Sequence, residues 1–218
     1  GDHRDLHSFP TRRSSDLRGA TSVRNPSTPW VVNQENAYPH PQKANEVLQR
    51  DLENGQTGIH LVLNDATTGS DEIGEKGIVI QDIDDINTLF ENIHLNRYPI
   101  YIPAGAISFP LLSLLAAYLK EKKIFLGDVK GTVGADPLGT LVLKGRLPST
   151  LTSIYDVLAK TTEWTIHHIP NLSTILVQGQ PYHNGGGSAV EELAFSLATA
   201  VEYVDNMLNR GLTINEVA

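Results

Sequence analysis

The chain has 218 residues, of which 40% are hydrophobic and 19% charged, a composition typical of a globular protein with one large domain or two small ones. It has no apolar run of about 18 residues, so we expect no membrane span. A formal net charge of −8 argues against a nucleic-acid partner. The absence of cysteine excludes disulfides and thiolate metal sites.

The first 17 residues differ in character from the rest of the chain. They read GDHRDLHSFPTRRSSDL and show neither helical nor strand periodicity. They resemble a translated sequencing-adapter segment, and a natural disordered tail is the alternative. We therefore predict that residues 1–17 are an artefact and exclude them from the fold, and we expect residues 18–36 to form an irregular N-terminal arm.

From residue 41 onward, helical and strand patterns alternate. Helices are predicted at 41–54, 82–93, 111–122, 151–160 and 189–209. Strands are predicted at 58–63, 98–102, within 124–133 and at 173–178, with residues 164–166 leading into the last strand. A short segment at 78–80 is expected to pair locally, residues 69–76 to form a polar loop, and residues 136–139 to form a turn or a helix start.

Four such alternations without a hairpin signal predict an α/β fold with a parallel sheet. Four βα units are half of a (β/α)8 TIM barrel, and the chain stops just after Thr213 and Glu216, whose capping-box spacing predicts another helix. We therefore expect residues 37–218 to be a truncated N-terminal half barrel. A complete four-stranded flavodoxin-like sheet is the rival fold.

A polar, glycine-rich turn follows the last predicted strand. It reads Tyr-His-Asn-Gly-Gly-Gly-Ser at 182–188, at the carboxyl end of a parallel strand, where such folds keep their chemistry. His183 could act as a general acid or bond a carbonyl, or simply bond backbone within a turn. For Tyr182, packing is favoured over catalysis. Gly185, Gly186 and Ser188 could hold an anion, and a plain flexible turn is equally consistent.

Other candidate residues carry weaker signals. His167 and His168 are adjacent on a presumed strand and would point to opposite faces, so we expect no metal there. Asp65 and Asp136 each follow a predicted strand, where carboxylates can be catalytic but more often cap helices. No nucleotide-binding glycine loop, serine nucleophile elbow or zinc-protease helix is present in the sequence.

Several ordered motifs resemble one enzyme family. They are Trp-Val-Val-Asn-Gln at 30–34, Ala-Asn at 44–45, Gly-Thr-Val at 131–133, the 182–188 motif, and Gly-Leu-Thr-Ile-Asn-Glu at 211–216. Together they are similar to the substrate-binding barrel of methylmalonyl-CoA mutases. The resemblance implies a cytoplasmic enzyme that isomerises methylmalonyl-CoA and succinyl-CoA by a radical route with adenosylcobalamin, with the CoA arm threaded through the barrel.

The same resemblance implies that cobalamin is held elsewhere. In the family, a separate domain binds it through the histidine of an Asp-x-His-x-x-Gly motif, which this sequence lacks. We therefore expect no cofactor-binding residue and no metal on this chain, with adenosylcobalamin bound by a missing domain or by a partner chain.

Departures from the family pattern distinguish two kinds of subunit. Glu35 stands where the catalytic chain has Tyr, and Gly134-Ala135 stand where it has Gln-Asn. Arg146 lies near the place of the substrate-carboxylate arginine without matching its motif. Losing the Gln amide and the Arg, at about 1.5–3 kcal/mol per charge-assisted hydrogen bond, would weaken binding of the thioester carbonyl and carboxylate by ~10² to ~10⁴.

The segment Gly-Ala-Asp-Pro-Leu-Gly at 134–139 resembles the small subunit of heterodimeric mutases. We therefore expect a non-catalytic small subunit that stabilises a large catalytic partner, and we leave open whether it binds acyl-CoA. Tyr182-His183 keep the catalytic type, so a truncated catalytic chain is the alternative, and an unrelated βα binding module is a third. Either half barrel would expose strand edges and an apolar face, which predicts poor solubility or self-association.

Overall fold

The computed structural model describes residues 30–64 and 77–217. Residues Val32–Ala218 form one compact unit, and the account below concerns that unit. The expected adapter-like segment at 1–17 and the polar loop at 69–76 lie outside the described residues, as does Asp65.

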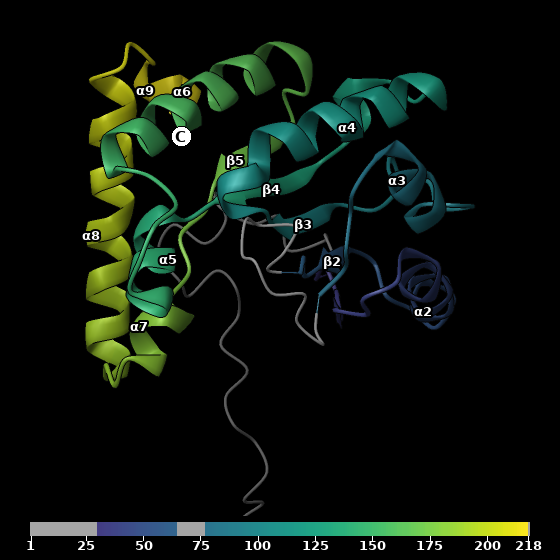
Figure 1. The fold of residues 1–218 in the computed structure, drawn as a ribbon, viewed down its shortest axis with the longest axis horizontal. Coiled ribbons are helices and arrows are strands. Elements are labelled where there is room, and N and C mark those ends of the chain that lie inside the picture. Colours follow the sequence, from purple (N-terminus) through teal and green to yellow (C-terminus); the bar gives the residue numbers. More distant parts are fainter. Residues whose placement is uncertain (1–29, 65–76, 218) are drawn as a thin grey trace, which may run out of the picture. The chain divides into compact units, whose positions relative to one another are not determined.

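Five parallel strands form one sheet in the order β1-β2-β3-β4-β5 (Figure 1). They are β1 (Glu35–Asn36), β2 (Ile59–Leu61), β3 (Ile100–Pro103), β4 (Gly131–Ala135) and β5 (Leu172–Ile175). The four predicted strands are confirmed, and β1 is an additional strand that the sequence did not indicate. Strands that are neighbours in the sheet are also neighbours in the chain. In a flavodoxin-like sheet, by contrast, the strand order changes direction at one point within the sheet.

The helices alternate with the strands as predicted (Figure 1). They are α2 (Pro41–Glu53), α3 (Ile83–Leu89), α4 (Ser108–Glu121), α5 (Pro137–Lys144), α6 (Leu151–His168), α7 (Gln180–Asn184), α8 (Ala189–Leu208) and α9 (Ile214–Val217). The segment at 78–80 pairs locally as expected, through one bridge between Leu63 and Ile78.

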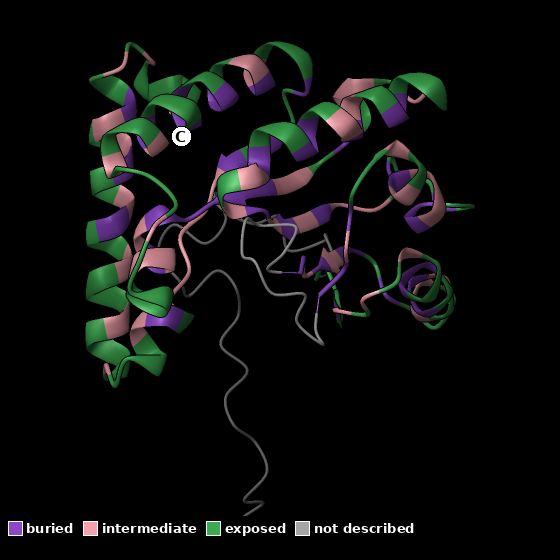
Figure 2. Cartoon of the chain, viewed as in Figure 1, coloured by how far each residue is buried: buried purple, intermediate pink, exposed green. Residues whose placement is uncertain are grey.

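One face of the sheet carries the main hydrophobic core. Alternate strand residues point to this face and pack against α2, α3 and α4, and Figure 2 shows buried residues on both the strands and the helix sides that meet them. The strand members are Ile59, Leu61, Ile100, Ile102, Val133 and Leu172. A second, smaller cluster joins the end of β4 to α6 and α8 through Ala135, Tyr155, Leu158, Ala159, Tyr203 and Met207.

The opposite face of the sheet carries a polar row. Five residues that pair across successive strands share one level: Glu35, His60, Tyr101, Thr132 and Ser173. The rings of His60 and Tyr101 meet edge to face, with centroids 4.7 Å apart. The pairing of β4 with β5 contains an irregularity, because Thr132 pairs with Ser173 but Ala135 pairs with Ile175. One extra residue of β4 therefore lies between these two pairs.

Helix α6 is longer than predicted, and residues 164–166 belong to it rather than to a strand. The threonines in this stretch favour a strand by propensity. Here the Thr161, Thr162 and Thr165 hydroxyls donate to carbonyl oxygens four residues earlier, at 2.7, 2.9 and 2.7 Å. His167 and His168 consequently end a helix, and the His168 ring stacks on Trp164 with centroids 4.5 Å apart.

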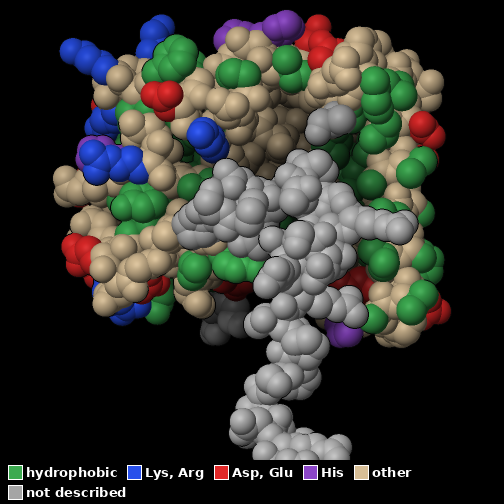
Figure 3. Space-filling view, turned by 180° about the vertical axis from the view of Figure 1, so that it is seen from behind, with side chains coloured by type: hydrophobic (Ala, Val, Ile, Leu, Met, Phe, Trp, Pro, Cys, Tyr) green, Lys and Arg blue, Asp and Glu red, His purple; other side chains and the backbone are tan. Residues whose placement is uncertain are grey.

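The longest helix, α8, buries an unexpected side. Its apolar residues recur at three- and four-residue steps, as an amphipathic helix requires, but that stripe is exposed. Thr199, Tyr203 and Met207 form the buried side instead. In Figure 3, hydrophobic side chains recur along the edge of the molecule formed by α8. The described part of the chain leaves this stripe without a covering element.

Candidate functional site

A cavity of about 360 Å³ lies at the carboxyl ends of β2, β3, β4 and β5. This is the end of a parallel sheet at which α/β proteins bind ligands. Its lining is mainly apolar, with Val62, Pro103, Leu143, Leu147 and Leu176 among its members. Polar groups enter from Asp136, Thr140, Arg146 and Gln178.

Asp136 is buried at the end of β4, and its carboxylate accepts three hydrogen bonds from the protein. One oxygen, Oδ1, accepts hydrogen bonds from the Gly139 amide at 2.9 Å and from the Tyr203 hydroxyl. The other, Oδ2, accepts a hydrogen bond from the backbone amide of Gln178 at 2.9 Å. Asp136 therefore caps α5 and fastens that helix to α8 and to the loop after β5, which confirms the capping interpretation.

Tyr203 supplies the link from α8. Burial, followed by the neighbouring Asp136 carboxylate, raises the pKa of Tyr203 far above its ordinary value. The hydroxyl therefore stays protonated and can donate to Asp136, while it also accepts a hydrogen bond from the Leu138 amide at 2.8 Å. Sequence reasoning missed Tyr203, since it lies within the helix but off the apolar stripe.

Tyr182 and His183 lie in the short helix α7 rather than in an open turn. The Tyr182 hydroxyl is 2.5 Å from the Thr199 hydroxyl of α8, and its ring packs on Phe195 with centroids 5.5 Å apart. His183 Nδ1 is 3.3 Å from a carboxylate oxygen of Glu192. Both residues therefore contact α8, and neither is among the residues that line the cavity.

The glycine-rich turn links α7 to α8. Gly186 has a φ of +98°, a conformation that favours glycine, and the Gly185 amide donates to the Pro181 carbonyl at 3.1 Å. Ser188 caps α8: its Oγ accepts from the Glu191 amide, and Glu191 accepts from the Ser188 amide at 2.8 Å. Both halves of a capping box are therefore present, and the hydrogen bonds that the Ser188 amide and hydroxyl donate to the Glu191 carboxylate lower the pKa of Glu191.

The end of β4 is tightly packed at position 134, which also borders the cavity. A Cβ added to Gly134 would lie 3.0 Å from the Leu176 Cβ and 3.1 Å from the Thr174 carbonyl oxygen. Ala135 is buried in the second core cluster. The two positions that depart from the catalytic pattern are therefore packed and apolar.

The polar row of the sheet contains Glu35, the remaining position at which this chain departs from the catalytic pattern. Glu35 pairs in register with His60. Burial lowers the pKa of His60, and the charge of Glu35 opposes this in part. Burial also raises the pKa of Tyr101, and the nearby side chain of Gln178 opposes this in part. Gln178 thus joins the row to Asp136, a role that its position at the end of a predicted strand did not reveal.

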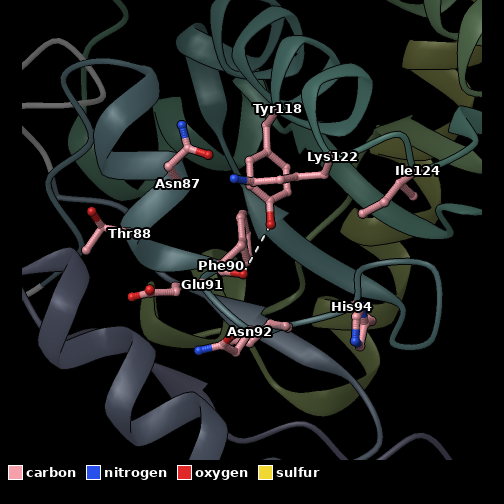
Figure 4. A pocket seen from close by; sticks show the side chains of 10 residues that line it. Asn87, Thr88, Phe90, Glu91, Asn92, His94, Tyr118, Lys122 and Ile124 are labelled. Atoms are coloured by element: carbon pink, nitrogen blue, oxygen red, sulfur yellow. Dashed lines mark hydrogen bonds between the residues drawn. The ribbon is translucent and has the colours of Figure 1, made fainter.

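A second cavity, of about 610 Å³, lies between α3 and α4 (Figure 4). The Tyr118 hydroxyl donates there to the Phe90 carbonyl at 3.1 Å, and Lys122 lies over the Tyr118 ring. Its lining residues lie at the carboxyl ends of these helices and in the segments that lead to β3 and β4, so the cavity lies at the amino ends of the strands. That end of a parallel sheet serves stability rather than chemistry, and we do not assign the site to it.

Within residues 30–64 and 77–217, no group of three or more His, Asp or Glu side chains could hold a metal ion. Within the same ranges, no helix combines the length and the apolar character that crossing a bilayer demands.

Comparison with known proteins gives a consistent result. A family model described as methylmalonyl-CoA mutase matches residues 4–218. Similar curated proteins include a methylmalonyl-CoA mutase of Rhizobium meliloti (25% identical, 93% of this chain and 30% of that protein) and a methylmalonyl-CoA mutase small subunit of Streptomyces virginiae (28%, 92% and 30%).

The human mitochondrial methylmalonyl-CoA mutase is 25% identical over 87% of this chain and 26% of its own length. The chain thus spans about 30% of the length of the first curated relatives. The match to the family model begins at residue 4, within the segment that resembles an adapter, whose interpretation stays a prediction.

Proposed function

The chain belongs to the methylmalonyl-CoA mutase family, and from that premise we propose that it is part of a non-catalytic small subunit that stabilises a large catalytic subunit. The enzyme would be a cytoplasmic heterodimer that interconverts methylmalonyl-CoA and succinyl-CoA. One relative, from Streptomyces virginiae, is named a small subunit. The proposed fold is half of a (β/α)8 barrel, in keeping with the five parallel strands in chain order.

The observation that carries this proposal is the carboxyl end of β4. The resemblance puts Gln-Asn there in catalytic chains, with the Gln amide binding the thioester carbonyl. Here Gly134 is closely surrounded by Leu176 and Thr174, and Ala135 belongs to the core. Without an amide, no side chain at this position can donate a hydrogen bond to the thioester carbonyl, and about 0.5–1.5 kcal/mol is lost with such a neutral bond.

The direction of the catalytic-type pair supports the same conclusion. The Tyr182 hydroxyl is engaged by Thr199, and His183 is paired with Glu192, so both are turned to α8. The His60 and Tyr101 rings also occupy the sheet face that would line the barrel, in the path that the resemblance gives to the CoA arm. Two rings at one level narrow that path.

The residues of this chain do not fit the cobalamin cofactor of the family. The sequence lacks the Asp-x-His-x-x-Gly motif, and His183, at the carboxyl end of the sheet, is already paired with Glu192. We therefore place adenosylcobalamin on the partner chain or on a further domain, and we route no chemical step through this chain.

The proposal is tested by co-expression with a large mutase subunit that carries the intact Tyr, Gln-Asn and cobalamin motifs. We expect the two chains to co-purify, the large subunit to unfold at higher temperature in the complex, and this chain alone to give no isomerisation with added adenosylcobalamin. Isomerisation by the full-length parent of this chain without any companion polypeptide would overturn the proposal.

The alternative, a truncated catalytic chain, is favoured by one observation, the retained Tyr182-His183 pair. Titration of the chain with succinyl-CoA separates the two functions. A catalytic chain is expected to bind succinyl-CoA, whereas the small subunit is expected to bind ~10² to ~10⁴ more weakly, because the Gln amide and the Arg of the catalytic pattern are missing. The matched variant Glu35→Tyr should not restore binding by itself, since Gly134 and Ala135 remain apolar.

A further inference from the structure

The sequence contains the dipeptide Asn-Gly twice, at Asn54-Gly55 and at Asn184-Gly185. Asparagine is one of the chemically labile residues, because the amide nitrogen of the following residue can attack its side-chain carbonyl carbon. A glycine in that following position has no Cβ to hinder the approach. The same local chemistry is therefore present at two places, and the fold decides how readily each of them reacts.

At the first dipeptide, the fold holds the side chain of Asn54 in place. Asn54 caps the carboxyl end of the 13-residue helix α2, and its side-chain Nδ2 donates a hydrogen bond to the Arg50 carbonyl at 2.6 Å. The Gly55 amide, whose nitrogen would attack, donates to the Leu52 carbonyl at 3.3 Å. The group that would leave Asn54 is therefore tied to the helix, and the reaction requires this bond to break first.

At the second dipeptide, the side chain of Asn184 is not held. Asn184 is exposed at the end of α7, a helix of only five residues, and its side chain makes no hydrogen bond to any residue that the structure describes. Three glycines follow it, so no side chain shields the backbone there. The Gly185 amide donates to the Pro181 carbonyl at 3.1 Å, but this is a terminal bond of a very short helix, and helix ends fray.

We propose that Asn184 is a site of spontaneous deamidation, a covalent modification next to the candidate catalytic pair. The Gly185 nitrogen bonds to Cγ of Asn184 and gives up its proton to water, while the Cγ–Nδ2 bond breaks and the nitrogen leaves as ammonia. Water then opens the cyclic succinimide. Attack of water at Cγ gives aspartate, and attack at the backbone carbonyl carbon gives isoaspartate, whose main chain runs through Cβ and Cγ. The reaction consumes water, releases ammonia and requires neither an oxidant nor a reductant.

The position of Asn184 gives the modification a consequence for the site. Asn184 directly follows His183, whose Nδ1 is 3.3 Å from a carboxylate oxygen of Glu192. Either product adds a negative charge beside this pair, so the modified turn repels an anionic ligand. Isoaspartate also lengthens the main chain by a methylene group within the turn that the Gly187 amide closes by donating to the Tyr182 carbonyl at 3.1 Å. This inference is independent of whether the chain is a small or a catalytic subunit.

The test compares the two dipeptides within one molecule. The full chain is incubated in mildly alkaline buffer, folded in one sample and unfolded in guanidinium chloride in another. Peptide mass spectrometry follows each asparagine, and labelling by an isoaspartate methyltransferase identifies the isoaspartate product. In the unfolded sample both dipeptides should convert at similar rates, because only the local chemistry remains. In the folded chain, Asn184 should convert about 10-fold faster than Asn54, because Asn54 must first lose its hydrogen bond.

Gly185→Ala is the matched variant. Gly185 has a φ of −70°, which alanine also adopts, and an added Cβ would lie 3.4 Å from the Pro181 and Tyr182 carbonyl oxygens, an ordinary contact. The variant should therefore give the circular dichroism spectrum of the parent, retain Asn184 and convert it several-fold more slowly, because the new Cβ hinders the attack. Equal rates at Asn54 and Asn184 in the folded chain, or an unchanged rate at Asn184 in Gly185→Ala, would overturn the proposal.

Discussion

The Tyr203 hydroxyl donates a hydrogen bond to the Asp136 carboxylate, 67 residues earlier in the chain, and so joins α8 to the end of β4. The neighbouring Tyr155 ring lies edge to face with Tyr203, at 6.0 Å between centroids, but its buried hydroxyl has no hydrogen-bond partner among the described residues. Of the two tyrosine hydroxyls in this cluster, that of Tyr203 is hydrogen-bonded and that of Tyr155 is buried without a partner among the described residues.

This pair gives a matched test of the Asp136 network. Tyr203→Phe should lower the free energy of unfolding by about 1.5–3 kcal/mol, because a bond to a buried carboxylate is lost. Tyr155→Phe should change it by less than about 1 kcal/mol in either direction, since it removes an unsatisfied hydroxyl and keeps the ring. Urea-induced unfolding measures both values, and equal losses would show that the network does not stabilise the fold.

The packing at the end of β4 is tested by restoring an amide side chain there. Gly134→Gln should lower stability by about 1–3 kcal/mol, because the new Cβ approaches Leu176 and Thr174 too closely. The control Ala117→Gln, at an exposed position on α4, should stay within about 0.5 kcal/mol of the parent. A Gly134→Gln protein as stable as the parent would indicate that the site can accept a catalytic amide.

The capping box of α8 provides a third test. Ser188→Ala should cost about 1 kcal/mol, because the amide of Glu191 loses its acceptor at the helix start. Ser149→Ala, in an exposed loop, serves as the control and should be close to neutral. Thermal unfolding followed by circular dichroism gives both changes. A Ser188→Ala protein with unchanged stability would show that this cap does not stabilise α8.

The polar row predicts a pH dependence. Burial lowers the pKa of His60 in the folded state below its ordinary value of 6.5. The unfolded chain therefore takes up this proton first, so the contribution of His60 to stability is complete above pH 6.5 and is lost as pH falls through the folded pKa. Histidine NMR signals followed against pH should show one midpoint below 6.5 that disappears in His60→Gln. A midpoint at or above 6.5 would contradict the burial seen here.

The alternation of helices and strands could be predicted from the sequence because it depends on local periodicity. The stretch at 161–166 could not, since the β-branched threonines favour a strand until their hydroxyls find carbonyl oxygens one helical turn back. Strand β1, only two residues long, depends on its pairing with β2 and has no pattern of its own.

The candidate site was predicted less completely than the fold. The motif at 182–188 correctly indicated the segment after β5 and the start of α8, because caps and glycines are local signals. Periodicity also predicted α8 itself, but it could not say which side is buried. The contacts of Tyr182 with Thr199 and of Tyr203 with Asp136 follow from that choice. The sequence therefore indicated which segments form the candidate site, but not which side of α8 their side chains contact.

The irregular pairing of β4 with β5 has a consequence for chain length. Thr132 and Ala135 are three residues apart on β4, whereas their partners Ser173 and Ile175 are two apart on β5. Deleting Gly134 would make the two strands match in count and would remove the local bend and twist that the extra residue gives β4. Asp136 follows directly and its carboxylate accepts from three donors, so a one-residue deletion in this strand should be less well tolerated than a similar change in a surface loop.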